Sequence, residues 1–138
     1  MSTIIIDQHK IAKGKYGDLF CISATVCGLI IADTKKNIDS PPVLIACHLG
    51  ALDTELTEYE EFCEMLSETQ TNRIFIFTQP IPSEEKDFYK SSARKISENC
   101  IKTYFYTTKN SNGMIAVQFD YNGNISNLGD SFNNFNYL

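Results

Sequence analysis

Residues 20–33 read FCISATVCGLIIAD, an apolar and β-branched run with no charged residue before Asp33. A run of this kind predicts a central β-strand. Strand side chains alternate between two faces, so the even-numbered residues from Phe20 to Val26 share one face and the odd-numbered residues from Cys21 to Cys27 share the other. Residues 34–37 predict a turn after this strand. Residues 43–48, VLIACH, then predict a second strand, antiparallel to the first.

Downstream, the pattern predicts two amphipathic helices and three further strands. Apolar residues at helical spacing predict a helix over about 54–68, and Ser83 caps a second one with Cys100 on its inner face. The fold class expected is α+β in mixed layers, with a predominantly antiparallel sheet core and two helices. The remaining predicted strands are 73–78, 102–108 and 114–121, with a hairpin turn at 110–113 and another at 122–123.

Length and composition are those of one globular domain. The chain has 138 residues, 43% of them hydrophobic and 21% charged, which excludes wholesale disorder. No apolar run approaches the roughly 18 residues of a membrane-spanning helix, so no membrane span is expected. Six asparagines crowd the last seventeen positions, and this tail, about 122–138, is predicted to be weakly tied to the rest.

The charge balance argues against nucleic acid as a partner. Twelve Lys and Arg stand against seventeen Asp and Glu, a net charge of −5. Nucleic-acid binders carry a basic stripe, whereas the one short basic cluster here is Lys10, Lys13 and Lys15. Three lysines beside a loop are typical of a solvated edge.

Cysteine usage indicates free thiols. Five cysteines, an odd number without CxxC spacing, argue against a disulfide framework and against a zinc site, so no metal or cofactor is expected. The first residues, MSTIIID, lack the features of a Sec-type signal peptide. We expect a cytoplasmic protein, or one exported by a Sec-independent route.

Cys27 and His48 are the candidate reactive pair. A cysteine nucleophile needs a base within hydrogen-bond reach, and a hairpin centred on residues 37–39 brings these two nearly opposite each other. His48 ends a strand, a common catalytic position, whereas His9 is expected at the surface. The alternative for Cys27 is ordinary core packing, since free cysteines are often buried. Cys47, Cys63 and Cys100 are expected to be structural.

The run SATVCGLII, residues 23–31, followed by HLG at 48–50, resembles the Cys…His core of the glutamine-deamidase superfamily, which includes the chemoreceptor deamidase CheD and the catalytic domain of cytotoxic necrotizing factor toxins. In these families the cysteine stands at the start of a strand and the histidine on the next strand. The downstream order of elements is similar too, over roughly residues 18–128. No glycine precedes Cys27 here, since Ala24-Thr25-Val26 replaces the family's Leu-Ser-Gly.

The resemblance implies a reaction and a partner. Cys27 would attack the side-chain amide of a glutamine in a partner protein, and His48 would serve as general base and then acid. Gly28 would allow close approach to backbone N–H groups that hold the oxyanion, and Ser23 or Thr25 would orient the imidazole. An exported bacterial effector or toxin that modifies a host protein is the implied setting.

Three alternatives stay open from the sequence. Cys21, in Leu19-Phe20-Cys21, is a rival position for the nucleophile. An amine in place of water would make the reaction a transamidation. The chain could instead be a non-enzymatic module that binds a basic partner through the acidic face of the helix at 54–68. The oligomeric state is not indicated.

Overall fold

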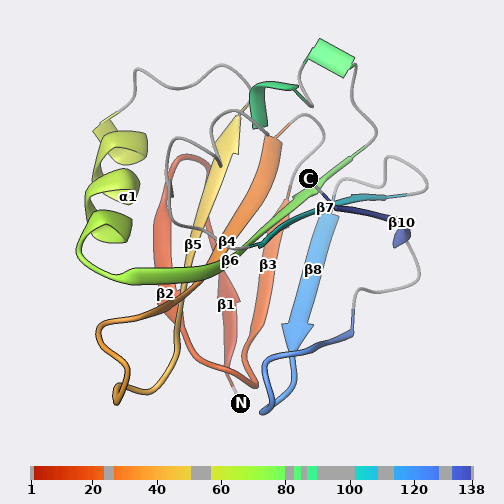
Figure 1. Cartoon of the computed structure of the whole chain (residues 1–138). Helices are drawn as coiled ribbons and strands as arrows, with labels where there is room; N and C mark the ends of the chain where they lie inside the picture. The colour runs from red at the N-terminus through yellow and green to blue at the C-terminus, as the bar shows by residue number, and fades with distance from the viewer. Residues whose placement is uncertain are drawn as a thin grey trace.

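In the computed structural model, the residues described are 2–23, 27–50, 57–79, 83–84, 87–89, 102–108, 114–127 and 132–137. Within these residues, ten strands form two sheets, and one long helix packs on the larger sheet (Figure 1). The fold is therefore α+β and dominated by strands, as the sequence predicts.

The larger sheet has six strands. In spatial order they are β10 (Phe132–Tyr137), β7 (Lys102–Thr108), β6 (Gln70–Thr78), β4 (Cys27–Lys35), β5 (Val43–Gly50) and β2 (Ile11–Gly14). The smaller sheet has four, in the order β1 (Thr3–Ile5), β3 (Leu19–Ser23), β8 (Met114–Phe119) and β9 (Ile125–Asn127). Neighbours are antiparallel except for the parallel pairs β1–β3 and β6–β7.

Strand β4 is buried on both faces, which explains its continuous apolar sequence. Leu29 and Ile31 pack between the two sheets, against Phe20 and Ile22 of β3. Ile30, on the other face of β4, belongs to a second cluster beneath the helix. In Figure 1 the helix lies to the left of β5 and β4, and β3 and β8 lie to their right.

The helix, α1 (Thr57–Ser67), falls within the predicted range 54–68, of which residues 54–56 are not described. Phe62 and Leu66, four residues apart, point at the sheet and are buried. Each such side chain contributes about 1.5–3 kcal/mol by leaving water. Helical residues recur at 83–84 and 87–89, in the predicted second helix, and its remainder, including Cys100, lies outside the described residues.

The prediction of one strand over residues 20–33 is wrong. The run forms two strands, β3 and β4, which belong to different sheets. The physical reason lies in the alternation: Phe20 and Ile22 face the core at even positions, whereas Leu29 and Ile31 face it at odd positions. Because the side-chain period of a strand is two, one straight strand cannot present both sets to the same core.

The predicted hairpin between residues 102–108 and 114–121 is also wrong. Strand β7 pairs with β6 and β10 in the large sheet, and β8 pairs with β3 and β9 in the small one. The apolar pattern is consistent with this separation. Phe105 packs under the helix while Tyr104 and Tyr106 pack between the sheets, so β7 has apolar contacts on both faces. The turn at 110–113 lies among the residues not described.

The other predicted strands are confirmed, with longer bounds for β5 and β6, and four strands were missed. The missed strands are β1, β2, β9 and β10. The last two lie in the asparagine-rich tail, where strand pairing overrides a composition typical of loops. The turn at 122–123 is confirmed. Gly123 has a φ of 85°, a left-handed conformation that favours glycine.

An ion pair joins the far ends of β4 and β6. Arg73 Nε donates to Asp33 Oδ2 at 2.9 Å, and the Tyr16 hydroxyl donates to the same oxygen at 2.8 Å. Arg73 also donates to the carbonyl of Gly123 at 2.7 Å and lies over the ring of Phe75. Burial and the hydrogen bond to Asp33 raise the pKa of Tyr16 to about 12. The network ties the β8–β9 turn to the large sheet.

Arg73→Met is expected to lower the free energy of unfolding by about 2–4 kcal/mol, because it leaves the buried Asp33 carboxylate without its counter-ion. Tyr16→Phe should cost about 1 kcal/mol, the net value of one hydrogen bond. Urea unfolding measures both. The matched control is Lys36→Met, which removes an exposed cation from the turn after β4. Equal costs for Arg73→Met and Lys36→Met would contradict this role for the ion pair.

Candidate functional site

His48 points into the core between the two sheets. It lies opposite Leu29 in the β4–β5 ladder, and only 3% of its surface is exposed. Its Nδ1 lies 2.9 Å from the carbonyl oxygen of Ile6. A carbonyl can only accept, so Nδ1 carries the proton and Nε2 carries the lone pair in the neutral ring. Nε2 is buried and has no hydrogen-bond partner among the described residues.

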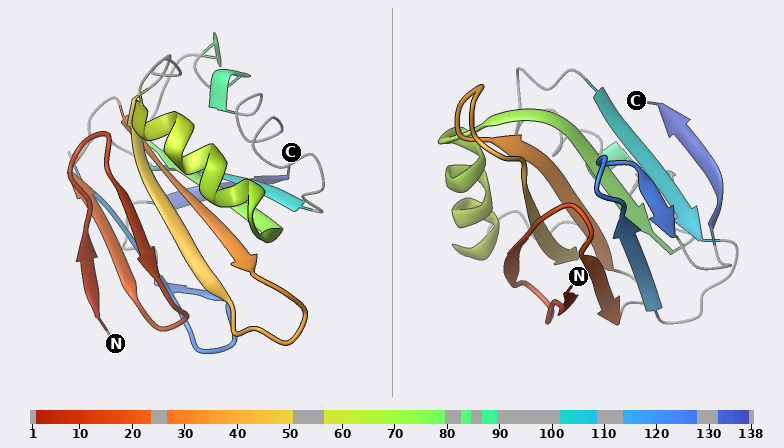
Figure 2. Two further views of the ribbon diagram at one scale, coloured as in Figure 1. Left: turned by 90° about the vertical axis from the view of Figure 1, so that its left-hand side faces the viewer. Right: turned by 90° about the horizontal axis from the view of Figure 1, so that it is seen from below.

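The contact with Ile6 exists because the chain crosses from one sheet to the other beside His48. Strand β1 lies in the small sheet and β2 in the large one, and the left view of Figure 2 shows the turn that joins them. The Ile6 N–H donates to the Cys21 carbonyl at 3.0 Å, on the small sheet. The His9 N–H donates to the His48 carbonyl at 2.8 Å, on the large sheet. Both ends of the crossing are thus fixed.

His9 is only partly buried, and its backbone has a φ of 64°, in the left-handed region that is uncommon for residues other than glycine. This conformation closes the turn from Asp7 to Lys10, in which the Lys10 N–H donates to the Asp7 carbonyl at 3.1 Å. The turn brings two ionisable side chains, Asp7 and His9, within electrostatic range of His48.

The surroundings of His48 favour its neutral form. Burial lowers the pKa of His48 below its ordinary value, and the nearby His9 lowers it further. The hydrogen bond to Ile6 and the charge of Asp7 act in the opposite direction but do not outweigh burial. A neutral imidazole with a free lone pair is the state that a general base requires.

Cys27 opens β4, and its backbone pairs with Gly50. The sequence predicts Cys27 nearly opposite His48, whereas the structure places Leu29 there, two residues along the strand. Since the side-chain period is two, positions 27 and 48 still belong to the same face and are diagonal neighbours. Such positions lie about 7–8 Å apart, within reach of a long side chain. The Cys27 side chain itself lies outside the described structure.

Gly28 has a clear packing reason. It lies between Leu49 of β5 and Thr78 of β6 in the large sheet. A Cβ atom at this position would come within 3.0 Å of the Tyr89 ring, whose hydroxyl donates to the Leu49 carbonyl at 2.9 Å. Because Gly28 has no side chain, the Tyr89 ring can pack against it on the helix side of the sheet.

Ser23 and Thr25 are the residues that the sequence comparison implied would orient the imidazole. Ser23 is exposed at the end of β3, opposite Met114, and Thr25 is not described. The group that holds Nδ1 is the main-chain carbonyl of Ile6. Sequence reasoning missed it because a backbone carbonyl is common to every residue type and leaves no mark in the sequence.

None of the other described cysteines shares the face of β5 on which His48 lies. Cys21 alternates with the core residues Phe20 and Ile22 and so faces outward from the small sheet. Cys47 is buried on the helix side of β5, and Cys63 is half-buried on α1, as expected. Burial raises the pKa of the Cys21 thiol and that of the Cys63 thiol, which disfavours the reactive thiolate at both.

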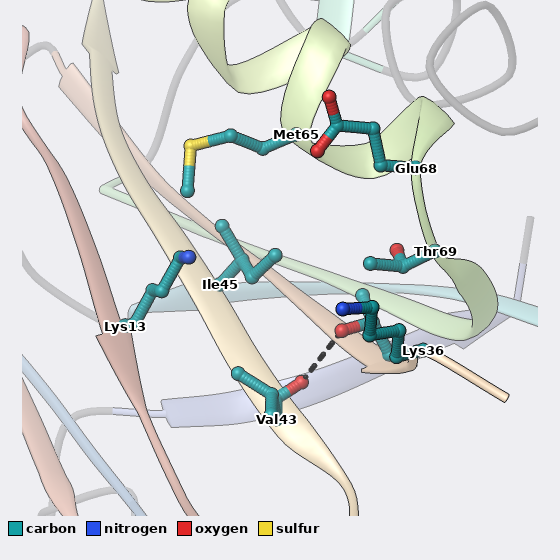
Figure 3. A pocket seen from close by; sticks show the side chains of 8 residues that line it. Lys13, Lys36, Val43, Ile45, Met65, Glu68 and Thr69 are labelled. Atoms are coloured by element: carbon teal, nitrogen blue, oxygen red, sulfur yellow. Dashed lines mark hydrogen bonds between the residues drawn. The ribbon is translucent and has the colours of Figure 1, made fainter. Parts of the chain in front are cut away.

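A cavity of about 230 Å³ lies elsewhere, between α1 and the end of the large sheet farthest from Cys27 (Figure 3). Val43, Ile45 and Met65 give it apolar walls, and Lys13, Lys36 and Glu68 stand at its rim. None of the predicted site residues lines it. It is therefore separate from the Cys27–His48 face.

The described residues hold no group of three or more His, Cys, Asp or Glu side chains arranged to bind a metal ion. No helix in this part of the chain is long and apolar enough to cross a membrane.

Comparison with protein-family models, with curated proteins and with solved structures finds no match to this chain.

The imidazole of His48 is expected to titrate below pH 6.5, the ordinary value for histidine, because burial disfavours its charged form. Its contribution to stability should be complete above pH 6.5 and should fall as the pH drops from 6.5 to the lower folded-state pKa, since the unfolded chain binds the proton more readily. Proton NMR of the ring, assigned by comparison with His48→Gln, measures the midpoint. A midpoint at or above 6.5 would contradict the inferred environment.

Proposed function

We propose that the protein is a cysteine-dependent protein-glutamine deamidase with Cys27 as nucleophile and His48 as general base. One observation carries the proposal: the His48 ring is fixed through Nδ1 by Ile6, and its Nε2 is buried, has no hydrogen-bond partner among the described residues, and belongs to the same face as position 27. The placement of Cys27 at the start of β4 and of His48 on the next strand also agrees with the layout of the families that the sequence resembles.

In the proposed reaction, Nε2 of His48 takes the proton of the Cys27 thiol. The thiolate attacks the side-chain carbonyl carbon of a substrate glutamine, and a backbone N–H next to Cys27 stabilises the oxyanion. The C–N bond then breaks, and ammonia leaves with the proton returned by His48. Water, deprotonated by His48, hydrolyses the thioester to glutamate and free thiol. An amine in place of water would give the transamidated product.

The residues around the pair suit this chemistry. Gly50 lies directly opposite Cys27 in the β4–β5 ladder and places no side chain against it. The carbonyl of Ile6 would also accept a hydrogen bond from Nδ1–H in the imidazolium that forms after proton transfer, so the ring need not turn during the reaction. The low pKa of His48 makes the imidazolium a ready proton donor to the leaving ammonia.

Brief treatment with substoichiometric iodoacetamide at neutral pH is expected to alkylate Cys27 ahead of the other four cysteines, because a paired base supplies thiolate. His48→Ala should slow labelling of Cys27 and leave labelling of Cys63 unchanged. Peptide mass spectrometry measures both. If Cys27 stays unlabelled until the protein unfolds, its thiol is buried in the core. That result would contradict the deamidase proposal and favour the alternative of a non-enzymatic binding module. Preferential labelling of Cys21 would identify Cys21, in place of Cys27, as the nucleophile.

In glutamine-to-glutamate conversion of a substrate protein, Cys27→Ala should abolish activity and His48→Ala should lower the rate by a factor on the order of 10²–10⁴. The matched control, Cys63→Ala, removes a half-buried thiol on α1 and should leave the rate unchanged. Mass spectrometry of the substrate detects the conversion of amide to acid. Full activity of Cys27→Ala would exclude the proposed nucleophile.

A further inference from the structure

The floor of the cavity between α1 and the large sheet is apolar. Val43 and Ile45 of β5 form this floor, and the Met65 side chain extends toward it from the helix (Figure 3). Ile45 is only 2% exposed and belongs to the cluster under the helix, so the floor is continuous with the hydrophobic core. Methionine is flexible and polarisable, and it adapts to apolar ligands of different shapes. The interior of the cavity therefore suits an aliphatic group.

The hydroxyl groups that line the cavity already donate hydrogen bonds within the protein. Thr34 Oγ1 donates to the Val43 carbonyl at 3.0 Å, and Thr69 Oγ1 donates to a carbonyl in the last turn of α1 at 3.2 Å. The remaining donors among the described side chains that line the cavity are the ammonium groups of Lys13 and Lys36. A polar group that enters the cavity therefore meets these two cations.

The two lysines come from different elements. Lys13 lies in β2 and pairs with Ile45, and Lys36 follows β4. Figure 3 shows their ammonium groups directed toward Ile45 from opposite sides. Both lysines are exposed, and neither ammonium group forms an ion pair with another described residue. Glu68 supplies the negative charge at the rim, so the described lining has one excess positive charge in a chain whose net charge is −5.

We propose that this cavity binds a small aliphatic monocarboxylate, with its chain on the apolar floor and its carboxylate between Lys13 and Lys36. A single negative charge matches the excess positive charge of the lining, whereas an aliphatic cation would be repelled by both lysines. A neutral alcohol of the same length would gain the apolar contact alone. The site is separate from the Cys27–His48 face and does not depend on the function proposed for that face.

The size of the cavity limits the length of the chain. Its volume of about 230 Å³ lies below the roughly 300–1,000 Å³ of pockets that hold drug-sized ligands. One water molecule takes up about 30 Å³ in the liquid, so the cavity has room for roughly eight non-hydrogen atoms. Hexanoate has this size, and a longer acid would extend its chain into water.

Methyl NMR of the full chain, labelled with carbon-13 at the methionine methyl groups, tests the proposal. Sodium hexanoate should shift the Met65 signal in a saturable manner, with a dissociation constant in the millimolar range expected of so small a ligand. The signal of Met114, on the small sheet, should not move. Met65→Leu assigns the signal. Butanoate, which is two methylenes shorter, should bind about tenfold more weakly, and decanoate should bind no more tightly than hexanoate.

Charge variants test the role of the rim. Lys13→Met and Lys36→Met should each weaken hexanoate binding about threefold to fivefold, because each removes an attractive charge at an exposed position. Glu68→Gln should tighten binding about twofold, because it removes the repulsive charge, and damage to the fold would not produce this opposite sign. The matched control is Lys15→Met, which removes an exposed lysine outside the lining and should leave binding unchanged.

Three results would overturn the proposal. The first is the absence of a saturable Met65 shift with hexanoate at concentrations up to tens of millimolar. The second is equal affinity for hexanoate and hexylamine, since recognition would then rest on the chain and not on the carboxylate. The third is unchanged hexanoate binding in both lysine variants, which would place the carboxylate elsewhere. None of these readouts depends on deamidase activity.

Discussion

Burial of β4 on both faces is the constraint on which the rest of the structure depends. Leu29 and Ile31 require a cover on one side, and Ile30 and Ala32 require a cover on the other. The small sheet meets the first requirement and α1 meets the second. Because β4 also has strand partners along both edges, its backbone groups are satisfied without water.

The sequence predicts the elements better than it predicts their partners. Strands β5, β6 and β7 and the helix α1 follow from local apolar patterns, which the sequence contains in full. The division of residues 20–33 between two sheets follows from a change of alternation that only a known core can reveal. The strands of the asparagine-rich tail depend on pairing with β7 and β8, a tertiary effect that overrides local propensity.

The candidate site shows the same limit. The sequence proposes the candidate pair, a cysteine and a histidine on successive strands, and the structure keeps positions 27 and 48 on one face while shifting their register by two residues. The orientation of the imidazole could not be predicted, because its partner is a main-chain carbonyl supplied by a segment more than forty residues earlier in the chain. Gly28 shows the converse: its sequence position suggested a chemical role, and its contact with Tyr89 gives it a structural one.

The main-chain contact between Ile6 and His48 has a consequence for how this protein can change over evolutionary time. A side-chain orienting group can be lost through a single nucleotide change, whereas a backbone carbonyl survives every substitution that keeps the local path of the chain. Ile6 is itself buried in the core, so a substitution at this position would act through the shape and hydrophobicity of the side chain. Other aliphatic residues at position 6 would therefore keep the His48 imidazole in the same orientation. A comparison of side chains alone would overlook the contribution of this position to the orientation of the ring.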